Sequence, residues 1–269
     1  MWNEIFDKIY VVSLRTSADR RKSIVKQFKQ AGVSDYEFHD AFGPDSACVK
    51  DLLGSEKVLH YPPCFRCGMA ACGSDDCNNV LIPPQIATFS TYLQLWEKIA
   101  AIPQRALIFE DDVVLHPWWP KVISTLIEWV NTGILEFGPN RSRLIRLGWA
   151  LCDDHDPMSE IKLSRQIKMS NPCHAMTSTF AARALERFES IYHTVDVVLH
   201  RDMPKTGEAV TVFPPIASEL SWSTGAFPSL IRPKENRAQY LESLGKFDEA
   251  EQMRGHALHH ATRIAHKNR

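Results

Sequence analysis

The first 43 residues of the chain alternate between two apolar runs and one amphipathic segment. "KIYVVSL" (8–14) is apolar and β-branched, as a buried strand requires. "SADRRKSIVKQFKQAG" (17–32) places Ile24, Val25 and Phe28 on one face of a helix that ends in glycine. "YEFHDAFG" (36–43) predicts a second short strand. This β-α-β opening is typical of α/β proteins, in which helices cover a largely parallel sheet.

The same alternation resumes after an interruption. Residues 44–85 read as loop, with two Pro-Pro pairs. Beyond them the pattern predicts helices over 86–102 and 117–131, strands over 105–115 and 142–151, a strand end running into a helix over 174–192, and a last strand over 209–220 that prolines end. We therefore expect one α/β domain over 1–233, with an insertion at about 60–82 and a helical C-terminal tail over 234–269.

Composition indicates a globular protein without a strong overall field. Hydrophobic residues make up 44% of the chain, charged residues 23%, and the formal net charge is −1. Such a chain needs a local patch to bind nucleic acid or an anionic membrane. No apolar run reaches the roughly 18–20 residues of a membrane span. Acidic residues precede the first apolar run, unlike a signal peptide, so we expect a cytoplasmic and reducing location.

Four of the seven cysteines are clustered in "CFRCGMAACGSDDC". Cys64, Cys67, Cys72 and Cys77 have the C-x2-C-x4-C-x4-C spacing of a zinc knuckle, with cysteine where histidine is usual. Four thiolates would close the coordination sphere, which predicts a structural Zn²⁺ that supports a loop rather than a catalytic ion. Four reduced cysteines, or a disulfide pair if the protein is exported, are the alternatives.

Zinc knuckles often bind single-stranded nucleic acid through an aromatic side chain and basic residues. Phe65 supplies the aromatic side chain, but residues 57–80 contain as many acidic as basic residues, so nucleic-acid binding is the less favoured interpretation. The tail segment 253–269 is rich in histidine and mildly basic. It is read either as a solvated helix face or as a peripheral contact with anionic lipid headgroups.

Three adjacent carboxylates interrupt an apolar segment in "LIFEDDVVL". Glu110, Asp111 and Asp112 repel one another and sit poorly in a buried strand. A divalent ion held between carboxylate and phosphate oxygens would offset their charge. In open α/β sheets, ligands bind at the carboxyl ends of strands. A solvated turn at the strand end is the alternative.

The motifs "VVSLRTSADRR", "YEFHDAFG", "LQLWEKIA" and "LIFEDDVVL", in this order, resemble glycosyltransferase family 25, which includes lipooligosaccharide and collagen galactosyltransferases. The resemblance runs from about residue 8 to 115 and continues more weakly to about 220. It implies a GT-A glycosyltransferase fold, a Rossmann-like mixed sheet with flanking helices. It also implies transfer of a hexose, galactose or glucose, from a UDP-sugar to a hydroxyl acceptor, most often a glycan.

The resemblance also implies roles for residues of the first 115 positions. Asp112 would ligate Mn²⁺ (or Mg²⁺), and the ion would stabilise the departing UDP. The expected donor-binding residues are Ser13, Leu14, Arg20, Asp40, Glu110 and Asp111. An exposed helix face is the alternative for Arg20 and, equally weighted, for Arg21; a turn-forming role is the alternative for Asp40.

The acceptor side is less well defined. Where family members usually have Ser-His before the helix tryptophan, this chain has Thr91 and Tyr92. An inverting transfer needs a base within reach of the acceptor hydroxyl. The resemblance implies acidic or amide residues lining the site at Asp196 and Glu219, which are therefore the expected catalytic residues, with Asp196 favoured and His174 a third option. Helix capping or a surface ion pair is the alternative for each.

Further aromatic and imidazole groups lie late in the sequence. Trp222 is a candidate for stacking on the acceptor, and nothing in the spacing selects a metal ligand among the tail histidines.

Hypotheses from two different classes, enzyme and binding module, follow. The favoured one is a metal-dependent UDP-sugar hexosyltransferase. The alternatives are a nucleic-acid-binding module on a degenerate glycosyltransferase scaffold, supported by Thr91 and Tyr92, or a glycosyltransferase that modifies a nucleobase.

Overall fold

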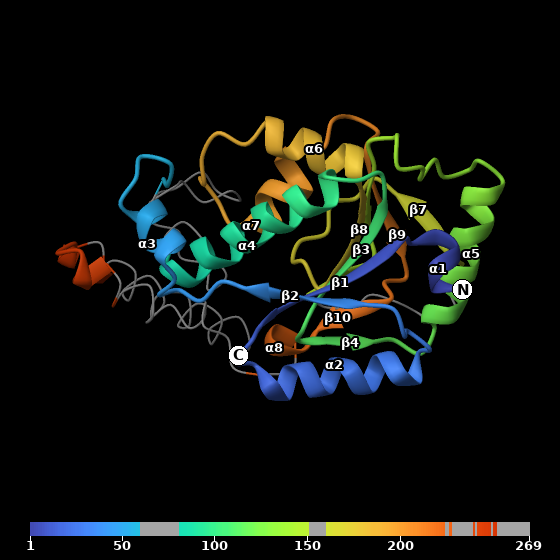
Figure 1. The fold of residues 1–269 in the computed structure, drawn as a ribbon, viewed down its shortest axis with the longest axis horizontal. Helices are drawn as coiled ribbons and strands as arrows, with labels where there is room; N and C mark the ends of the chain where they lie inside the picture. Colours follow the sequence, from blue (N-terminus) through green and yellow to red (C-terminus); the bar gives the residue numbers. More distant parts are fainter. Residues whose placement is uncertain are drawn as a thin grey trace, which may run out of the picture. The chain divides into compact units, whose positions relative to one another are not determined.

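A computed structural model of the chain describes residues 1–59, 81–150, 160–223, 226–227, 239, 241–248 and 250–251 (Figure 1). The helices are α1 (Trp2–Ile5), α2 (Ala18–Gln30), α3 (Ala47–Leu53), α4 (Pro83–Ala100), α5 (Trp119–Asn131), α6 (Ser178–Glu186), α7 (Val195–Val197), which continues into a π-helical turn (Val198–Asp202), and α8 (Leu220–Ser223). The strands are β1 (Lys8–Leu14), β2 (Glu37–Ala41), β3 (Arg105–Glu110), β4 (Val113–Leu115), β5 (Leu144–Arg146), β6 (Gly148–Trp149), β7 (Lys162–Ser164), β8 (Cys173–Thr177), β9 (Ala209–Phe213) and β10 (Ala217–Glu219).

The chain divides into two compact units, which we describe separately. Unit 1 consists of Met1–Ala41, Thr91–Phe188 and Asp196–Pro228. Unit 2 consists of Phe42–Ser90, Glu189–Val195 and Ser229–Arg269. The domain bounds inferred from the sequence, 1–233 and 234–269, stay a prediction.

Unit 1 contains a seven-stranded mixed sheet in the order β2-β1-β3-β8-β5-β9-β7. β1 runs parallel to both β2 and β3, and β5 runs parallel to β9. β8 is antiparallel to β3 and β5, and β7 is antiparallel to β9. The predicted strand 8–14, helix 17–32 and strand 36–43 are confirmed as β1, α2 and β2, so the β-α-β opening forms one edge of this sheet.

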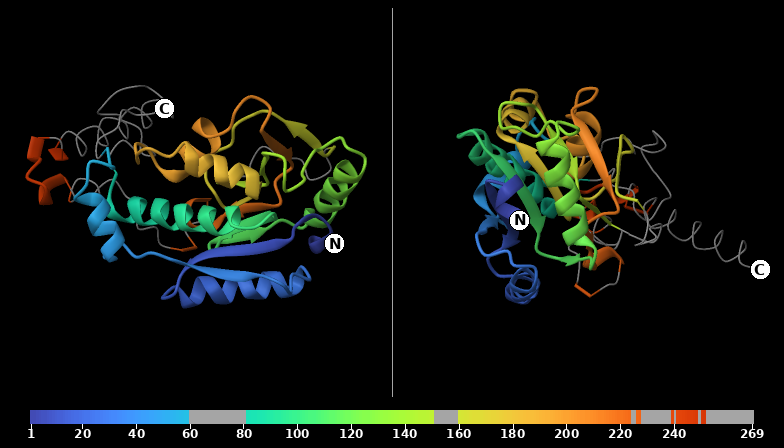
Figure 2. Two further views of the ribbon diagram at one scale, coloured as in Figure 1. Left: turned by 45° about the horizontal axis from the view of Figure 1, so that its top comes forward. Right: turned by 90° about the vertical axis from the view of Figure 1, so that its right-hand side faces the viewer.

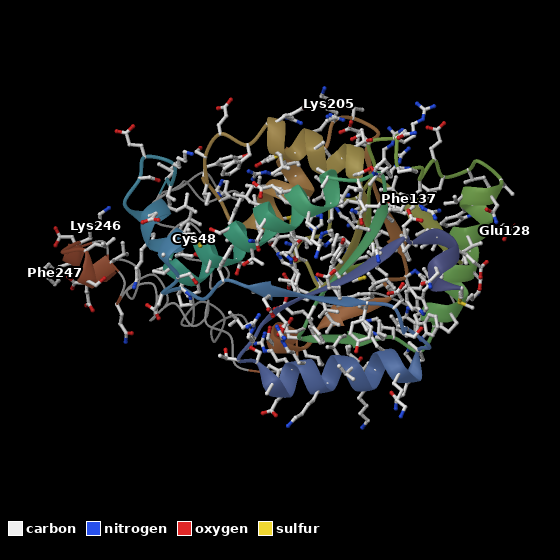
Figure 3. The ribbon with its side chains drawn as sticks, in the orientation of Figure 1. Cys48, Glu128, Phe137, Lys205, Lys246 and Phe247 are labelled. Carbon is white, nitrogen blue, oxygen red and sulfur yellow. The ribbon has the colours of Figure 1, made fainter. Side chains whose placement is uncertain are left out.

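One face of the sheet is apolar. Ile9 and Val11 of β1 point to this face and belong to one buried cluster with Phe28 of α2. The Phe28 ring packs edge-on against Phe109 of β3, with centroids 5.1 Å apart. Phe137, labelled in Figure 3, packs edge-on against the Phe6 ring at 6.1 Å. Burial of these rings supplies much of the driving force that holds α1, α2 and α5 to the sheet.

The opposite face carries polar side chains as well as apolar ones. The part of α4 from Thr91 onward covers it, and Tyr92 and Trp96 are fully buried. The Tyr92 ring stacks on the His174 ring of β8, with centroids 5.9 Å apart. α2 therefore lies on one side of the sheet and α4, with α6, on the other (Figures 1 and 2).

The expectation of one strand over 105–115 was wrong. β3 ends at Glu110, and after a turn at Asp111 and Asp112 the strand β4 joins a second, three-stranded sheet in the order β4-β10-β6. At this break both aspartates lie against the Arg20 guanidinium, a partner that buried carboxylates need in place of solvent.

The expected strand over 142–151 is divided in the same way. β5 ends at Arg146 in the large sheet, and β6 begins at Gly148 in the small one. A Cβ atom on Gly148 would lie 2.8 Å from the carbonyl oxygen of Ala217, so only glycine allows this approach. The last expected strand, 209–220, is also two strands, with β9 ending before the prolines and β10 following them. The short elements α1, α3 and β7 were not predicted.

Unit 2 contains α3 and the first part of α4. A parallel bridge joins Val58 to Ile191, and the Ile191 N–H donates to the Lys57 carbonyl at 2.8 Å. The proposed zinc ligands Cys64, Cys67, Cys72 and Cys77 lie outside the described residues, as do the histidines of the tail. Within the described ranges, no helix has the length and apolar character needed to cross a membrane.

Candidate functional site

The helices that lead into the two strands beside β1 lie on opposite faces of the sheet. β1 lies between β2 and β3, and the chain reaches β2 through α2 and β3 through α4. Because these helices lie on opposite faces, the carboxyl ends of β1 and β3 form a topological switch point, the usual ligand position in open α/β sheets. Ser13 and Leu14 are the last residues of β1, and Glu110 is the last residue of β3. Glu110 lies opposite Val12 of β1 in the sheet.

Three consecutive carboxyl side chains, the acidic corner (Glu110, Asp111 and Asp112), lie at this point. Asp111 and Asp112 are each only 6% exposed. The Ser13 hydroxyl donates to Asp111 Oδ2 at 2.6 Å. Arg20 Nη1 lies 3.2 Å from Asp111 Oδ1 and 3.3 Å from Asp112 Oδ2. One guanidinium is thus shared by two buried carboxylates, and its single charge can balance only one of them.

Glu110 is partly exposed at the end of β3, and its environment disfavours the carboxylate form. Burial, followed by the charges of Asp112 and Glu219, raises the pKa of Glu110 well above its ordinary value. The Tyr92 hydroxyl donates to Glu110 Oε1 at 3.0 Å. Burial also raises the pKa of Asp111, against the hydrogen bond from Ser13. The corner therefore favours binding of protons or of a cation.

The two expected catalytic residues come from the late part of the chain. β10 pairs with β4 so that Glu219 lies opposite Val113, and the Leu220 N–H donates to the Asp112 carbonyl at 2.6 Å. Ser170 donates hydrogen bonds to both Asp196 and Glu219, at 3.3 and 2.7 Å. The charges of these two carboxylates also raise the pKa of Glu110. The structure therefore brings together five of the carboxyl groups selected from the sequence.

Asp40 lies beside this group and has its own arginine partners. Arg21 Nη2 donates to Asp40 Oδ1, and the Arg21 and Arg15 guanidiniums hold the pKa of Asp40 below its ordinary value. Arg21 Nε also donates to the Ser13 hydroxyl, and its Nη2 to the Ser13 carbonyl, both at 3.0 Å. Arg21 thus contacts the end of β1, which decides against the exposed helix face that the sequence left as an equal alternative.

Arg20 makes a further contact with the late part of the chain. Its Cζ lies 5.4 Å from the ring centroid of Phe227, within the range of a cation–π interaction. The exposed-face alternative for Arg20 is therefore wrong, because its guanidinium lies between the acidic corner and an aromatic ring. Trp222 lies in α8, and its side chain is outside the described part of the structure.

His174 does not lie where an acceptor could reach it. It is fully buried, and burial, helped by the charge of Arg146, lowers the pKa of its imidazole to about 3. His200 is also buried, and burial lowers its pKa well below the ordinary value. Because His174 is fully buried and its lowered pKa makes the imidazole a weak proton acceptor, it is a poor candidate for the base.

The donor set of the corner is chemically suited to a hard divalent cation. Carboxylate oxygens are the side-chain ligands that Mn²⁺ and Mg²⁺ prefer, and the corner carries more negative charge than Arg20 offsets. Among the described residues, however, no three His, Cys, Asp or Glu side chains converge as a ready-made metal site. A cation here would need further ligands from a bound substrate or from water.

Comparison with known proteins gives two matches. Residues 6–198 match the family described as glycosyltransferase family 25 (LPS biosynthesis protein). A protein of Acanthamoeba polyphaga mimivirus, R655, which is named as a glycosyltransferase, is 26% identical over 127 residues, 46% of this chain. The chain covers only 34% of that viral protein. The mixed sheet with flanking helices also fits a glycosyltransferase fold.

Proposed function

The chain belongs to glycosyltransferase family 25, and from this membership and the acidic corner we propose that it transfers a hexose from a UDP-sugar to a hydroxyl group of a glycan. Galactose and glucose are the proposed sugars, and a GT-A arrangement is the proposed form of the fold. The observation that carries the proposal is the position of the corner at the switch point between β1 and β3.

Two arginines near the start of α2 suit the diphosphate of the donor. Arg20 contacts the acidic corner, and Arg21 contacts the end of β1. Both lie in the first turn of a 13-residue helix, where backbone N–H groups and the helix dipole also favour an anion. Binding of UDP would give Arg20 a phosphate partner in place of one carboxylate.

Asp112 is the proposed metal ligand, with Mn²⁺ or Mg²⁺ as the ion. When bound, the ion would stabilise the negative charge on the departing diphosphate. Asp111, held by Ser13 and Arg20, and Glu110, held by Tyr92, would line the ribose and the sugar.

Asp196 is the proposed base, with Glu219 beside it. As the acceptor oxygen bonds to the anomeric carbon of the sugar, its proton passes to the Asp196 carboxylate. The bond between that carbon and the diphosphate oxygen breaks, and UDP leaves with the electron pair. This in-line displacement would invert the configuration at the anomeric carbon.

The four cysteines support a second proposed metal, a structural Zn²⁺. Their spacing is the basis for it. Metal analysis of the purified protein should find one zinc per chain, and Cys72→Ser should lower this content. If protein purified in reducing buffer contains no bound zinc, the proposal is contradicted.

A thermal-shift screen tests the donor and the metal together. UDP, UDP-galactose and UDP-glucose are added with and without Mn²⁺, because a ligand that binds only the folded state raises its melting temperature. A shift that needs both nucleotide and Mn²⁺ is expected, and Asp112→Asn should remove it. Asp19→Asn is the matched control, since Asp19 is exposed on α2 and its ion-pair partner within the described residues is Lys22. If none of the three nucleotides raises the melting temperature of the wild-type protein, the proposed function is contradicted.

A further inference from the structure

The loop between β7 and β8 contains a residue in an unfavourable backbone conformation. Ser170 has φ of 78°, and within the described residues it is the only non-glycine residue with positive φ. Side chains with a Cβ atom rarely adopt this left-handed region, because Cβ approaches the following carbonyl. Strained residues of this kind concentrate at functional sites, where the surrounding structure holds them in place.

In this conformation Ser170 contacts both late carboxylates. Its backbone N–H donates to Asp196 Oδ2 at 3.3 Å, and its hydroxyl donates to Glu219 Oε2 at 2.7 Å. Asp196 comes from α7 and Glu219 from β10, two elements that are not adjacent in the sequence. Two neighbouring carboxylates repel each other, so donors that reach both of them favour their close approach.

A buried chain of hydrogen bonds holds the loop in place. It begins at Asn171, the residue after Ser170. Asn171 is 3% exposed, and its Oδ1 lies 2.6 Å from His200 Nε2. The amide oxygen is an acceptor, so we assign the His200 proton to Nε2. The buried Arg146 in turn donates from Nη2 to the His200 carbonyl. This chain joins β5 to the loop and limits the positions open to Ser170.

We propose that Ser170 is a positioning residue that holds Asp196 and Glu219 in the arrangement that acceptor deprotonation requires. The effect of Ser170 on catalysis rests on the proposed transferase function, but its positioning of the two carboxylates does not. A base must lie within hydrogen-bond reach of the proton that it removes, and small displacements lower the rate sharply. Ser170 fixes one carboxylate through its backbone and the other through its side chain.

Two substitutions separate the hydroxyl from the backbone conformation. Ser170→Gly removes the hydroxyl and favours positive φ, whereas Ser170→Ala removes the hydroxyl and keeps the Cβ atom. We expect both to lower kcat for Mn²⁺-dependent turnover of UDP-galactose or UDP-glucose about tenfold, with the donor KM unchanged. Ser170→Gly should melt at or above the wild-type temperature, so its loss of kcat would not reflect unfolding. A Ser170→Gly enzyme with wild-type kcat would overturn the proposal.

Ser221→Ala is the matched control. The Ser221 hydroxyl also donates to Glu219, at Oε1 and 2.7 Å, and the structure gives it no hydrogen bond to Asp196. We expect a fall in kcat of about twofold, smaller than for either Ser170 variant. An equal or larger fall would assign the effect to Glu219 alone and overturn the joint role of Ser170.

A crystal structure of the Ser170→Gly protein keeps this test independent of the proposed function. If the wild-type protein neither binds UDP nor turns over either UDP-sugar, the proposed function fails while the positioning claim still stands or falls on geometry. Glu219 leaving its wild-type rotamer, or moving away from Asp196, would support the claim. Both carboxylates in their wild-type positions would overturn it.

Discussion

Strands β1 and β3 have an arginine–aspartate contact at each end, and the two contacts differ in charge balance. At the amino end, Arg105 donates to the Asp7 carboxylate from its backbone N–H, Nε and Nη2, at 2.7, 3.0 and 2.8 Å. This pair is complete, with one cation, one anion and a two-pronged geometry. At the carboxyl end, Arg20 is shared by Asp111 and Asp112 beside Glu110.

The pKa directions follow this difference. The hydrogen bond from Arg105 lowers the pKa of Asp7, whereas burial raises the pKa of Asp111 and Glu110. The amino end therefore stabilises the fold, while ionised carboxylates at the other end destabilise it. Retaining such groups is expected where they bind a ligand. Substitutions at one end should therefore change stability, and substitutions at the other should change activity.

Asp112→Asn should have the largest effect. The amide cannot act as an anionic ligand, so we expect turnover of UDP-galactose or UDP-glucose with Mn²⁺ to fall about 100-fold or more. The melting temperature without ligand should be equal or higher, because one buried charge is removed. Steady-state kinetics and thermal melts check both parts. Near-wild-type turnover would show that the carboxyl end is only structural.

Arg20→Ala should have the next largest effect. Loss of the guanidinium removes a phosphate partner and leaves Asp111 and Asp112 less balanced, so we expect the donor KM to rise about tenfold. Arg15→Ala is the matched control, because the Arg15 side chain is 82% exposed and pairs with Asp40 instead. If the two variants have equal donor KM values, Arg20 does not contribute to donor binding.

Asp7→Asn should reverse this pattern. We expect it to lower the free energy of unfolding by about 1 kcal/mol, a small value because the pair is partly exposed and solvent screens it. For a chain of this size the melting temperature should fall by about 2–4 °C. Donor kinetics should match the wild type. A change in kcat or KM without a loss of stability would break the comparison between the two ends.

The pH dependence of stability should have opposite signs at the two ends. The pKa of Asp7 is lowered in the folded state, so its contribution is present above its ordinary value of 3.8 and is lost as pH falls below it. The stability difference between Asp7→Asn and wild type should therefore shrink in acid.

Glu110→Gln tests the other sign. The pKa of Glu110 is raised in the folded state, so its ionisation destabilises the fold as pH rises through that pKa. In EDTA, Glu110→Gln should be more stable than wild type at high pH, and the gain should vanish near its ordinary value of 4.5. Urea titrations across pH measure both variants. A gain that grows in acid would contradict the assigned direction.

The sequence predicted the elements whose periodicity is long and uninterrupted. β1, α2 and the helix α6 lie where their apolar patterns placed them. The breaks at Asp111 and Leu147 were missed, because apolar residues on both sides continue a strand pattern. Only tertiary pairing with β10 shows that β4 and β6 belong to another sheet.

The selected carboxylates were easier to predict than their partners. Glu110, Asp111 and Asp112 stand out because charge interrupts an apolar run. Arg21 and Ser170 carry no such signal, since an arginine on a polar helix face and a serine in a loop are common. The left-handed conformation of Ser170 depends on distant contacts, and no local pattern encodes it.

The pairing of β4 with β10 has a consequence during synthesis on the ribosome. Asp112 is translated long before Glu219, yet the Asp112 carbonyl is satisfied by the Leu220 N–H. The nascent chain can form the β-α-β opening early, but the backbone contacts of its acidic corner stay incomplete until β10 has emerged. Ribosome-stalled chains ending just before β10 should therefore retain the early fold and lack nucleotide affinity.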